Sequence, residues 1–153
     1  MSRSESGTQR QRLKKLDSIY TAIEEALHQQ GLKALTPADR HFYYAFATLG
    51  LVGNGGFQRF FEGSTDPETA AMAFEAIGSS AAAGAVAKAI SVFPRSKPMY
   101  GYWERMEFLS ELNDAKRAAI EVADDHFFGE MEDIEKRLFD YAHTSGLLAS
   151  WIT

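Results

Sequence analysis

The sequence contains no cysteine, which excludes disulfides, thiolate zinc sites and cysteine nucleophiles and suits a reducing cytoplasm. It also lacks a long hydrophobic run. The longest small-apolar stretch, 81–92, is interrupted by Gly84 and Lys88 and is far shorter than the ~20 residues that span a bilayer. The polar start, 1–11, has no apolar stretch of the kind a secretory signal requires. We therefore expect a cytoplasmic protein without a membrane segment.

The chain has 153 residues, 45% of them hydrophobic, which is enough for one domain with a buried core. Residues 1–12 are polar and predict a flexible N-terminal arm. From residue 13 onward, apolar side chains recur at helical spacing, so residues 13–153 predict a single helical domain. The predicted fold class is all-α, a compact bundle of about six to eight helices.

Local signals place several helix starts. Thr36 and Asp66 each precede a proline, which is the usual chemistry of a capped first turn. Ser79 or Ser80 is expected to cap the alanine-rich segment 81–89, whose small side chains suit a central buried helix or, alternatively, a dimer seam.

Beyond Pro98 the apolar pattern predicts one shorter helix and then one or two long helices from Asp114 to about Tyr141. The shorter helix is expected to run through Tyr102, Trp103, Met106 and Leu109. An apolar tail at residues 147–152 is expected to dock on the body or on a partner.

A glycine-rich turn stands in the middle of the chain. Gly53, Gly55 and Gly56 fall within four residues and predict a tight turn. The three aromatic residues that follow have i, i+3, i+4 spacing and predict a short aromatic helix planted in the core: Phe57, Phe60 and Phe61. The pair Asn54-Gly55 also suits a β-hairpin, but its flanks do not alternate apolar and polar residues.

Three segments carry a family resemblance. They are Asn54-Gly55-Gly56-Phe57 with Phe60-Phe61 and Ser64, then Ile77-Gly78-Ser79 before the alanine-rich helix that ends at Phe93, and finally Asp124-Asp125-His126-Phe127-Phe128. Over roughly residues 40–140 the chain resembles a bacterial family first catalogued as a domain of unknown function and later named for a DNA-mimic protein.

That resemblance implies a mainly helical fold and, for the namesake, an acidic dimer that occupies the DNA site of a DNA-binding protein. The chain departs from the family at three positions. Leu51 stands where the family often has an acidic residue, Gly53 where it often has Asn, and Arg59 where Gln is common. Any function that those polar positions share is expected to be reduced here.

Acidic residues are concentrated in one third of the chain. The net charge is -5, and residues 104–140 hold 12 acids against 5 bases. Glu104, Glu107 and Glu111 are spaced to form one line on a helix face. The residues predicted to contact a partner are Glu104, Glu107, Glu111, Asp114, Glu121, Asp124, Asp125, Glu132 and Glu135. Such a surface suits a basic partner, such as a transcription regulator or other DNA-binding protein, and disfavours direct nucleic-acid binding.

The sequence therefore predicts a non-enzymatic binding protein that forms a homodimer, competes with DNA for its partner and uses no cofactor. Two alternatives remain open. One is an antitoxin-like inhibitor of a basic enzyme. The other is a small metal-dependent enzyme built on Asp124, Asp125, His126 and Glu130, because His126 and Glu130 lie four residues apart on one helix face.

Overall fold

The structure, a computed structural model, describes residues 3–152. Within that range the fold is all-α, as predicted, with seven α-helices, two short 3-10 helices and no strand. The elements in chain order are α1 (Arg3–Gln30), η1 (Leu32–Ala34), α2 (Pro37–Glu62), α3 (Pro67–Ala76), α4 (Ser80–Ile90), η2 (Pro94–Ser96), α5 (Tyr102–Ser110), α6 (Asp114–Thr144) and α7 (Leu147–Trp151).

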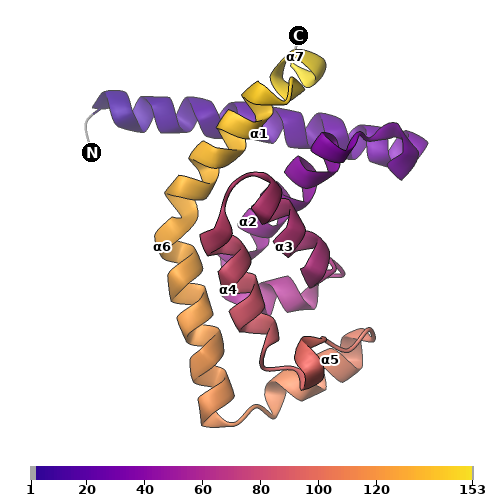
Figure 1. Cartoon of the computed structure of the whole chain (residues 1–153), viewed down its shortest axis with the longest axis vertical. Helices are drawn as coiled ribbons and strands as arrows, with labels where there is room; N and C mark the ends of the chain where they lie inside the picture. The colour runs from indigo at the N-terminus through magenta and orange to yellow at the C-terminus, as the bar shows by residue number, and fades with distance from the viewer. Residues whose placement is uncertain (1–2, 153) are drawn as a thin grey trace.

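The longest helix, α6, runs along one side of the molecule and organises the others (Figure 1). It packs against α4 and α2, and α3 packs against both α2 and α4. Helix α1 crosses one end of α6 beside α7, whereas α5 lies at the other end (Figure 1). Different helices therefore lie at the two ends of α6.

The helix starts lie where the sequence predicts them. Thr36 and Asp39 form a reciprocal capping box at α2: the Asp39 N–H donates to Thr36 Oγ1 at 3.1 Å, and the Thr36 N–H donates to Asp39 Oδ2 at 2.9 Å. The side chains of Asp66 and Ser79 cap α3 and α4 by accepting the N–H groups of Thr69 and Ala82. These caps satisfy amide groups that would otherwise lack a partner in the first turn.

Part of the predicted N-terminal arm is helical instead. Helix α1 begins at Arg3, so residues 3–12 extend it, while residues 1–2 lie outside the described range. Leu16, Ile19 and Ile23 are fully buried and fix the following turns of α1 on the body. Adding a turn to an existing helix avoids the cost of a new nucleus, so a polar segment can continue it.

The glycine-rich turn is a kink within α2. Helical backbone angles are interrupted at Gly55 and at Gly56, which has φ 68° and ψ -168°. That combination is essentially restricted to glycine. The kink separates the first part of α2 from the short aromatic helix at 57–62, so the hairpin alternative is wrong and the predicted loop is reduced to two residues.

The aromatic cluster forms the centre of the core, as predicted. Phe57, Phe60 and Phe61 are 0%, 1% and 2% exposed. The Phe127 ring of α6 contacts two rings edge-to-face: Phe57 at a centroid distance of 5.8 Å and Phe74 of α3 at 5.7 Å. Such pairs contribute about 0.5–1.5 kcal/mol each beyond the area they bury.

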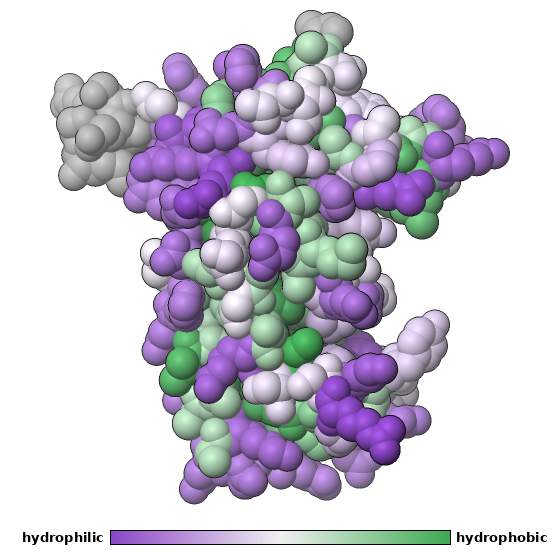
Figure 2. All heavy atoms as spheres, in the orientation of Figure 1, coloured by the Kyte–Doolittle hydropathy of each residue, from purple (hydrophilic) through white to green (hydrophobic). Residues whose placement is uncertain are grey.

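The small residues of α4 allow close packing at the same core. Ala82, Ala85 and Ala89 are buried, whereas Gly84 and Ala87 on the opposite face are exposed. Helix α4 is thus a buried helix with one open face. In Figure 2 this side of the molecule shows a band of apolar and neutral residues along α4.

The apolar tail docks on the body. Leu147 is buried, and the Trp151 indole N–H donates to Asp39 Oδ1 at 2.9 Å. Asp39 therefore joins the start of α2 to the end of the described chain. No helix within residues 3–152 is long and apolar enough to cross a membrane.

Candidate acidic binding surface

Helix α5 carries the first line of carboxylates. Glu104, Glu107 and Glu111 are all exposed and recur at i, i+3, i+7. Glu104 and Glu107 lie on one face of α5, and Glu111 is the C-cap residue that follows its last turn. Glu104 lies in the first turn, where a negative charge is favoured by the positive end of the helix dipole.

Helix α6 carries a second, longer line. Asp114, Glu121, Asp125 and Glu132 are exposed and follow one another at intervals of seven, four and seven residues. These intervals are close to whole numbers of turns, so the four carboxylates share one face over about 27 Å. The line starts immediately after Asn113, whose side chain caps α6 by accepting the Lys116 N–H at 2.9 Å.

Six of these carboxylates have no ion pair among the described residues. We call them the acidic surface: Glu104, Glu107, Glu111, Asp114, Glu121 and Asp125. Glu132 differs, because the Lys136 ammonium lies 3.6 Å from its carboxylate. In Figure 2 hydrophilic residues cover the lower end of the molecule, where α5 connects to α6.

The bases nearest to the acidic surface are used for other contacts. Arg117 donates from Nε to the Leu112 carbonyl at 3.0 Å, at the α5–α6 connection. The Lys116 ammonium lies 5.5 Å from the centroid of the Phe108 ring, a cation–π contact. These two side chains support the turn and leave the neighbouring carboxylates without a salt bridge.

Arg105 is the third base in this region, and it is buried at 8% exposure. Its guanidinium donates to four backbone carbonyls, at distances of 2.6–3.1 Å: those of Phe61, Gly63, Met99 and Tyr100. Two of these carbonyls lie at the C-terminal end of α2, where a cation is favoured. Arg105 therefore fixes α5 to α2 and offers no charge to solvent.

Asp124, predicted as part of the contact surface, is half-buried and faces the kink of α2. Its Oδ1 accepts the Phe57 N–H at 2.7 Å, which satisfies the amide that follows the break. Burial raises the pKa of the Asp124 carboxyl; the Phe57 N–H opposes this shift, and the charges of Asp125 and Glu121 add to it. The same carboxylate leaves no room for a side chain on Gly56, where a Cβ would lie 2.8 Å from Oδ2.

Glu135 also lies apart from the surface assigned to it. It is 8% exposed, and its Oε2 accepts a hydrogen bond from Gln9 of α1 at 3.1 Å. The structure thus assigns Asp124 and Glu135 to internal contacts, and the remaining members of the predicted set stay on the outside. Both internal partners are more than 60 residues away in sequence.

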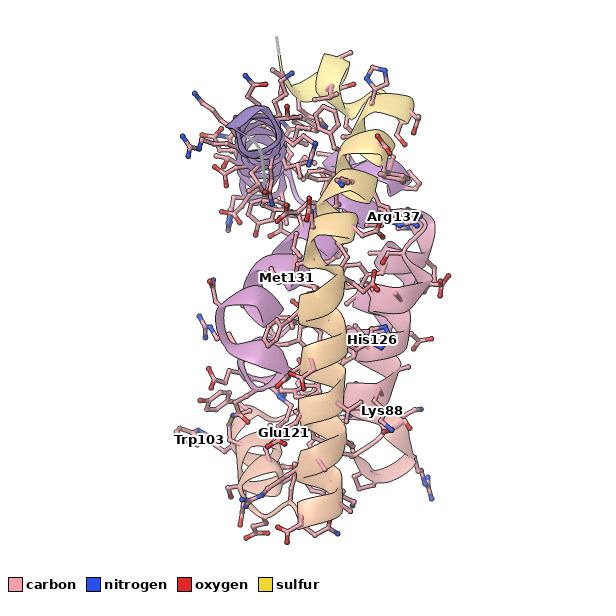
Figure 3. All side chains as sticks on the ribbon, turned by 90° about the vertical axis from the view of Figure 1, so that its left-hand side faces the viewer. Lys88, Trp103, Glu121, His126, Met131 and Arg137 are labelled. Carbon is pink, nitrogen blue, oxygen red and sulfur yellow. The ribbon has the colours of Figure 1, made fainter. Side chains whose placement is uncertain are left out.

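The residues of the metal-site alternative do not converge. Asp124 faces α2, while His126 lies on the opposite side of α6, toward α4 (Figure 3). In the part of the chain that the structure describes, no group of three or more His, Asp or Glu side chains is arranged to hold a metal ion.

An exposed aromatic group adjoins the acidic surface at the start of α5. Tyr100, Tyr102 and Trp103 are 102%, 45% and 81% exposed. Its ring contacts Tyr102 edge-to-face at 5.1 Å and projects away from the body (Figure 3). The sequence signal that marks this group is three aromatics within four residues directly before Glu104.

The fold is that of an all-α domain, and its acidic surface, which forms no ion pair within residues 3–152, lies next to exposed aromatic rings. The comparison with protein families is more specific: residues 33–145 match the DMP19-like protein family, and the chain belongs to it. No curated protein and no solved structure matches the chain. The family match includes α2 to α6 and leaves α1 entirely outside it.

Proposed function

We propose that this protein is a non-enzymatic DNA mimic, whose acidic surface occupies the nucleic-acid site of a basic partner such as a transcription regulator. The observation that carries the proposal is the set of six exposed carboxylates without ion pairs, beside bases that bind backbone and ring atoms. Membership of the DMP19-like family supports it. A DNA-binding protein recognises phosphates with Lys and Arg, so carboxylates on two helix faces compete for the same side chains.

The charge density sets a limit on this mimicry. Duplex DNA carries about one charge per 1.7 Å of axis, whereas the α6 line has four carboxylates over about 27 Å. One protomer therefore reproduces only part of the field of a duplex. We propose a homodimer, which brings two acidic surfaces to one partner; sedimentation at micromolar concentration tests it, and a monomer would remove this part of the proposal.

The exposed aromatic group adds a second kind of contact in this proposal. Trp103 and Tyr100 are exposed and closely precede Glu104 and Glu107 in the sequence. Arginine is attracted both to an aromatic face and to a carboxylate, and aromatic residues are common at the energetic centre of interfaces. We therefore assign the start of α5 to the centre of the contact and the α6 line to its extension.

The direct test is a charge-reversed variant in which Glu104, Glu107 and Glu111 are replaced by Lys. We expect it to lose at least ~100-fold in affinity for a partner recovered from cytoplasm by a low-salt pull-down, because like charges placed opposite each other cost several kcal/mol. Its thermal stability should change little, since surface substitutions usually cost within about 0.5 kcal/mol each.

A matched control carries the same change in net charge elsewhere: Glu25, Glu68 and Glu75, all exposed, replaced by Lys. It should bind the partner nearly as well as the original chain. Equal loss in both variants would mean that net charge alone matters and would remove the assigned surface.

The identity of the recovered protein separates the remaining alternatives. A DNA-binding protein that is released by salt and displaced by duplex DNA supports mimicry. A nuclease or toxin that is bound and inhibited, with no competition by DNA, supports the antitoxin-like inhibitor. Recovery of salt-resistant partners alone contradicts both electrostatic proposals.

A further inference from the structure

A cavity of about 380 Å³ lies where α1 passes the C-terminal half of α6, at the end of the molecule opposite α5. Its lining is Thr8, Gln11, Arg12 and Lys15 of α1 with Lys136, Phe139 and Asp140 of α6. The charged groups in this lining are three cations and one carboxylate. In Figure 2 hydrophilic residues gather where α1 meets α6, beside the grey N-terminal atoms.

Arg12, which belongs to the lining of this cavity, carries an unsatisfied donor. Its Nε is buried and has no hydrogen-bond acceptor. A buried charged donor without a partner costs at least the usual penalty of an unmade hydrogen bond. Arg40 also has a buried Nε without an acceptor, but its guanidinium is held by the Leu32 carbonyl at 2.7 Å, and it lies outside the lining of this cavity.

The neighbouring charges leave the cavity positive. The Lys15 ammonium lies 5.9 Å from the centroid of the Phe139 ring, a contact that does not neutralise it. Lys136 is 3.6 Å from Glu132, in a pair whose two side chains are more than half exposed. Such a pair is weak in solvent. Asp140 is exposed and forms no salt bridge within residues 3–152, and the nearby Glu135 accepts from Gln9.

We propose that this cavity binds a phosphate monoester or inorganic phosphate. Three cations and Asp140 give the lining a formal charge of +2, which matches the charge of about -1.5 to -2 that a phosphate monoester carries at neutral pH. A guanidinium donates in a planar fork and ammonium groups act as point charges from other directions, a combination suited to a tetrahedral oxyanion. The Arg12 guanidinium, whose Nε has no other acceptor, is the group that holds the anion.

This site is independent of the acidic surface and of its partner. Arg12 and Lys15 belong to the part of α1 that precedes the family match at residue 33. The cavity is therefore a property of this chain's N-terminal helix packed on α6.

The test is a titration of the full chain with inorganic phosphate at constant ionic strength, followed by the NMR signal of the Arg12 Nε–H group and by the backbone amides of residues 8–15. We expect a saturable downfield shift of the Arg12 signal. Arg12→Gln and, separately, the solvent-exposed Lys136→Gln should each weaken phosphate binding about 10- to 100-fold, as expected for loss of a charge-assisted hydrogen bond. Circular dichroism shows whether each variant retains its helices.

Arg40→Gln is the matched control, since it removes the other guanidinium with a buried unsatisfied Nε, and it should titrate like the original chain. An Arg12 signal that does not respond to phosphate would overturn the proposal. Unchanged binding in both Arg12→Gln and Lys136→Gln would do so as well. Dimethyl phosphate, a diester with a single charge, should bind more weakly; equal or tighter binding would contradict the assignment to a monoester.

Discussion

Replacing Gly56 by Ala tests the link between the kink in α2 and the carboxylate of Asp124. Ala at φ 68° and ψ -168° is strained by about 1–3 kcal/mol. Its Cβ would lie 2.8 Å from Asp124 Oδ2, so the carboxylate must move away from the Phe57 N–H. Leaving that amide without an acceptor adds about 1–3 kcal/mol. We expect a total loss of about 2–6 kcal/mol, a large part of the stability of an ordinary domain.

Urea unfolding followed by circular dichroism measures this loss. The control is Gly50→Ala, an exposed position in the same helix where a Cβ meets nothing within 4 Å. That change should stabilise the protein by about 0.4–1 kcal/mol, because alanine loses less conformational freedom in a helix than glycine.

A double-mutant cycle separates strain from collision. Asp124→Ala alone removes the hydrogen bond and should cost about 1–3 kcal/mol. In the double variant Gly56→Ala with Asp124→Ala the collision is absent, so its cost should be smaller than the sum of the single costs by about 1–3 kcal/mol. Additive costs, or a Gly56→Ala variant that loses less than about 1 kcal/mol, would refute the coupling.

Three further outcomes are expected. Phe57→Ala should lower the free energy of unfolding by about 3–5 kcal/mol, since the ring is fully buried; a loss below about 1 kcal/mol would contradict its place in the core. Asp124→Asn keeps an oxygen acceptor and removes a carboxyl group whose pKa is raised by burial. The variant should therefore be more stable than the original at neutral pH. The native state holds that proton more tightly than the unfolded chain, so this advantage should shrink as pH falls through the raised pKa, and urea unfolding across acidic pH measures it. Glu111→Gln should raise stability by about 0.3–1 kcal/mol, because a negative charge at the end of α5 opposes the helix dipole, while lowering affinity for the partner; thermal unfolding and the pull-down measure both.

The helices were predictable because their signals are local. Thr36, Asp66 and Ser79 cap the helices that follow them, and the spacing of Phe57, Phe60 and Phe61 predicts their common burial. Each of these inferences uses residues within one or two turns. The start of α1 was missed, because its polar residues are helical through continuation from buried turns further along the chain.

Local sequence signals could not show that Asp124 and Glu135 make internal contacts. Asp124 resembles an exposed carboxylate in the sequence, and only its contact with Phe57, 67 residues away, shows that it caps the kink. Glu135 is distinguished from Glu132 by a neighbour on α1, 126 residues away. Trp103 shares helical spacing with apolar residues, yet α5 is short and its start projects beyond the core, so the ring remains in solvent.

The acidic residues of the proposed interface differ in how they affect the stability of their own helices. Glu104 and Asp114 lie in first turns, where the helix dipole stabilises them and no partner is needed to explain their presence. Glu121 and Asp125 lie beyond the reach of that effect, and Glu111 lies at the end of α5, where a carboxylate is unfavourable. No salt bridge compensates these three within the described residues. Glu111 lowers the stability of its own helix, and Glu121 and Asp125 gain nothing from the helix dipole. These three are therefore the residues on which the DNA-mimic proposal depends most.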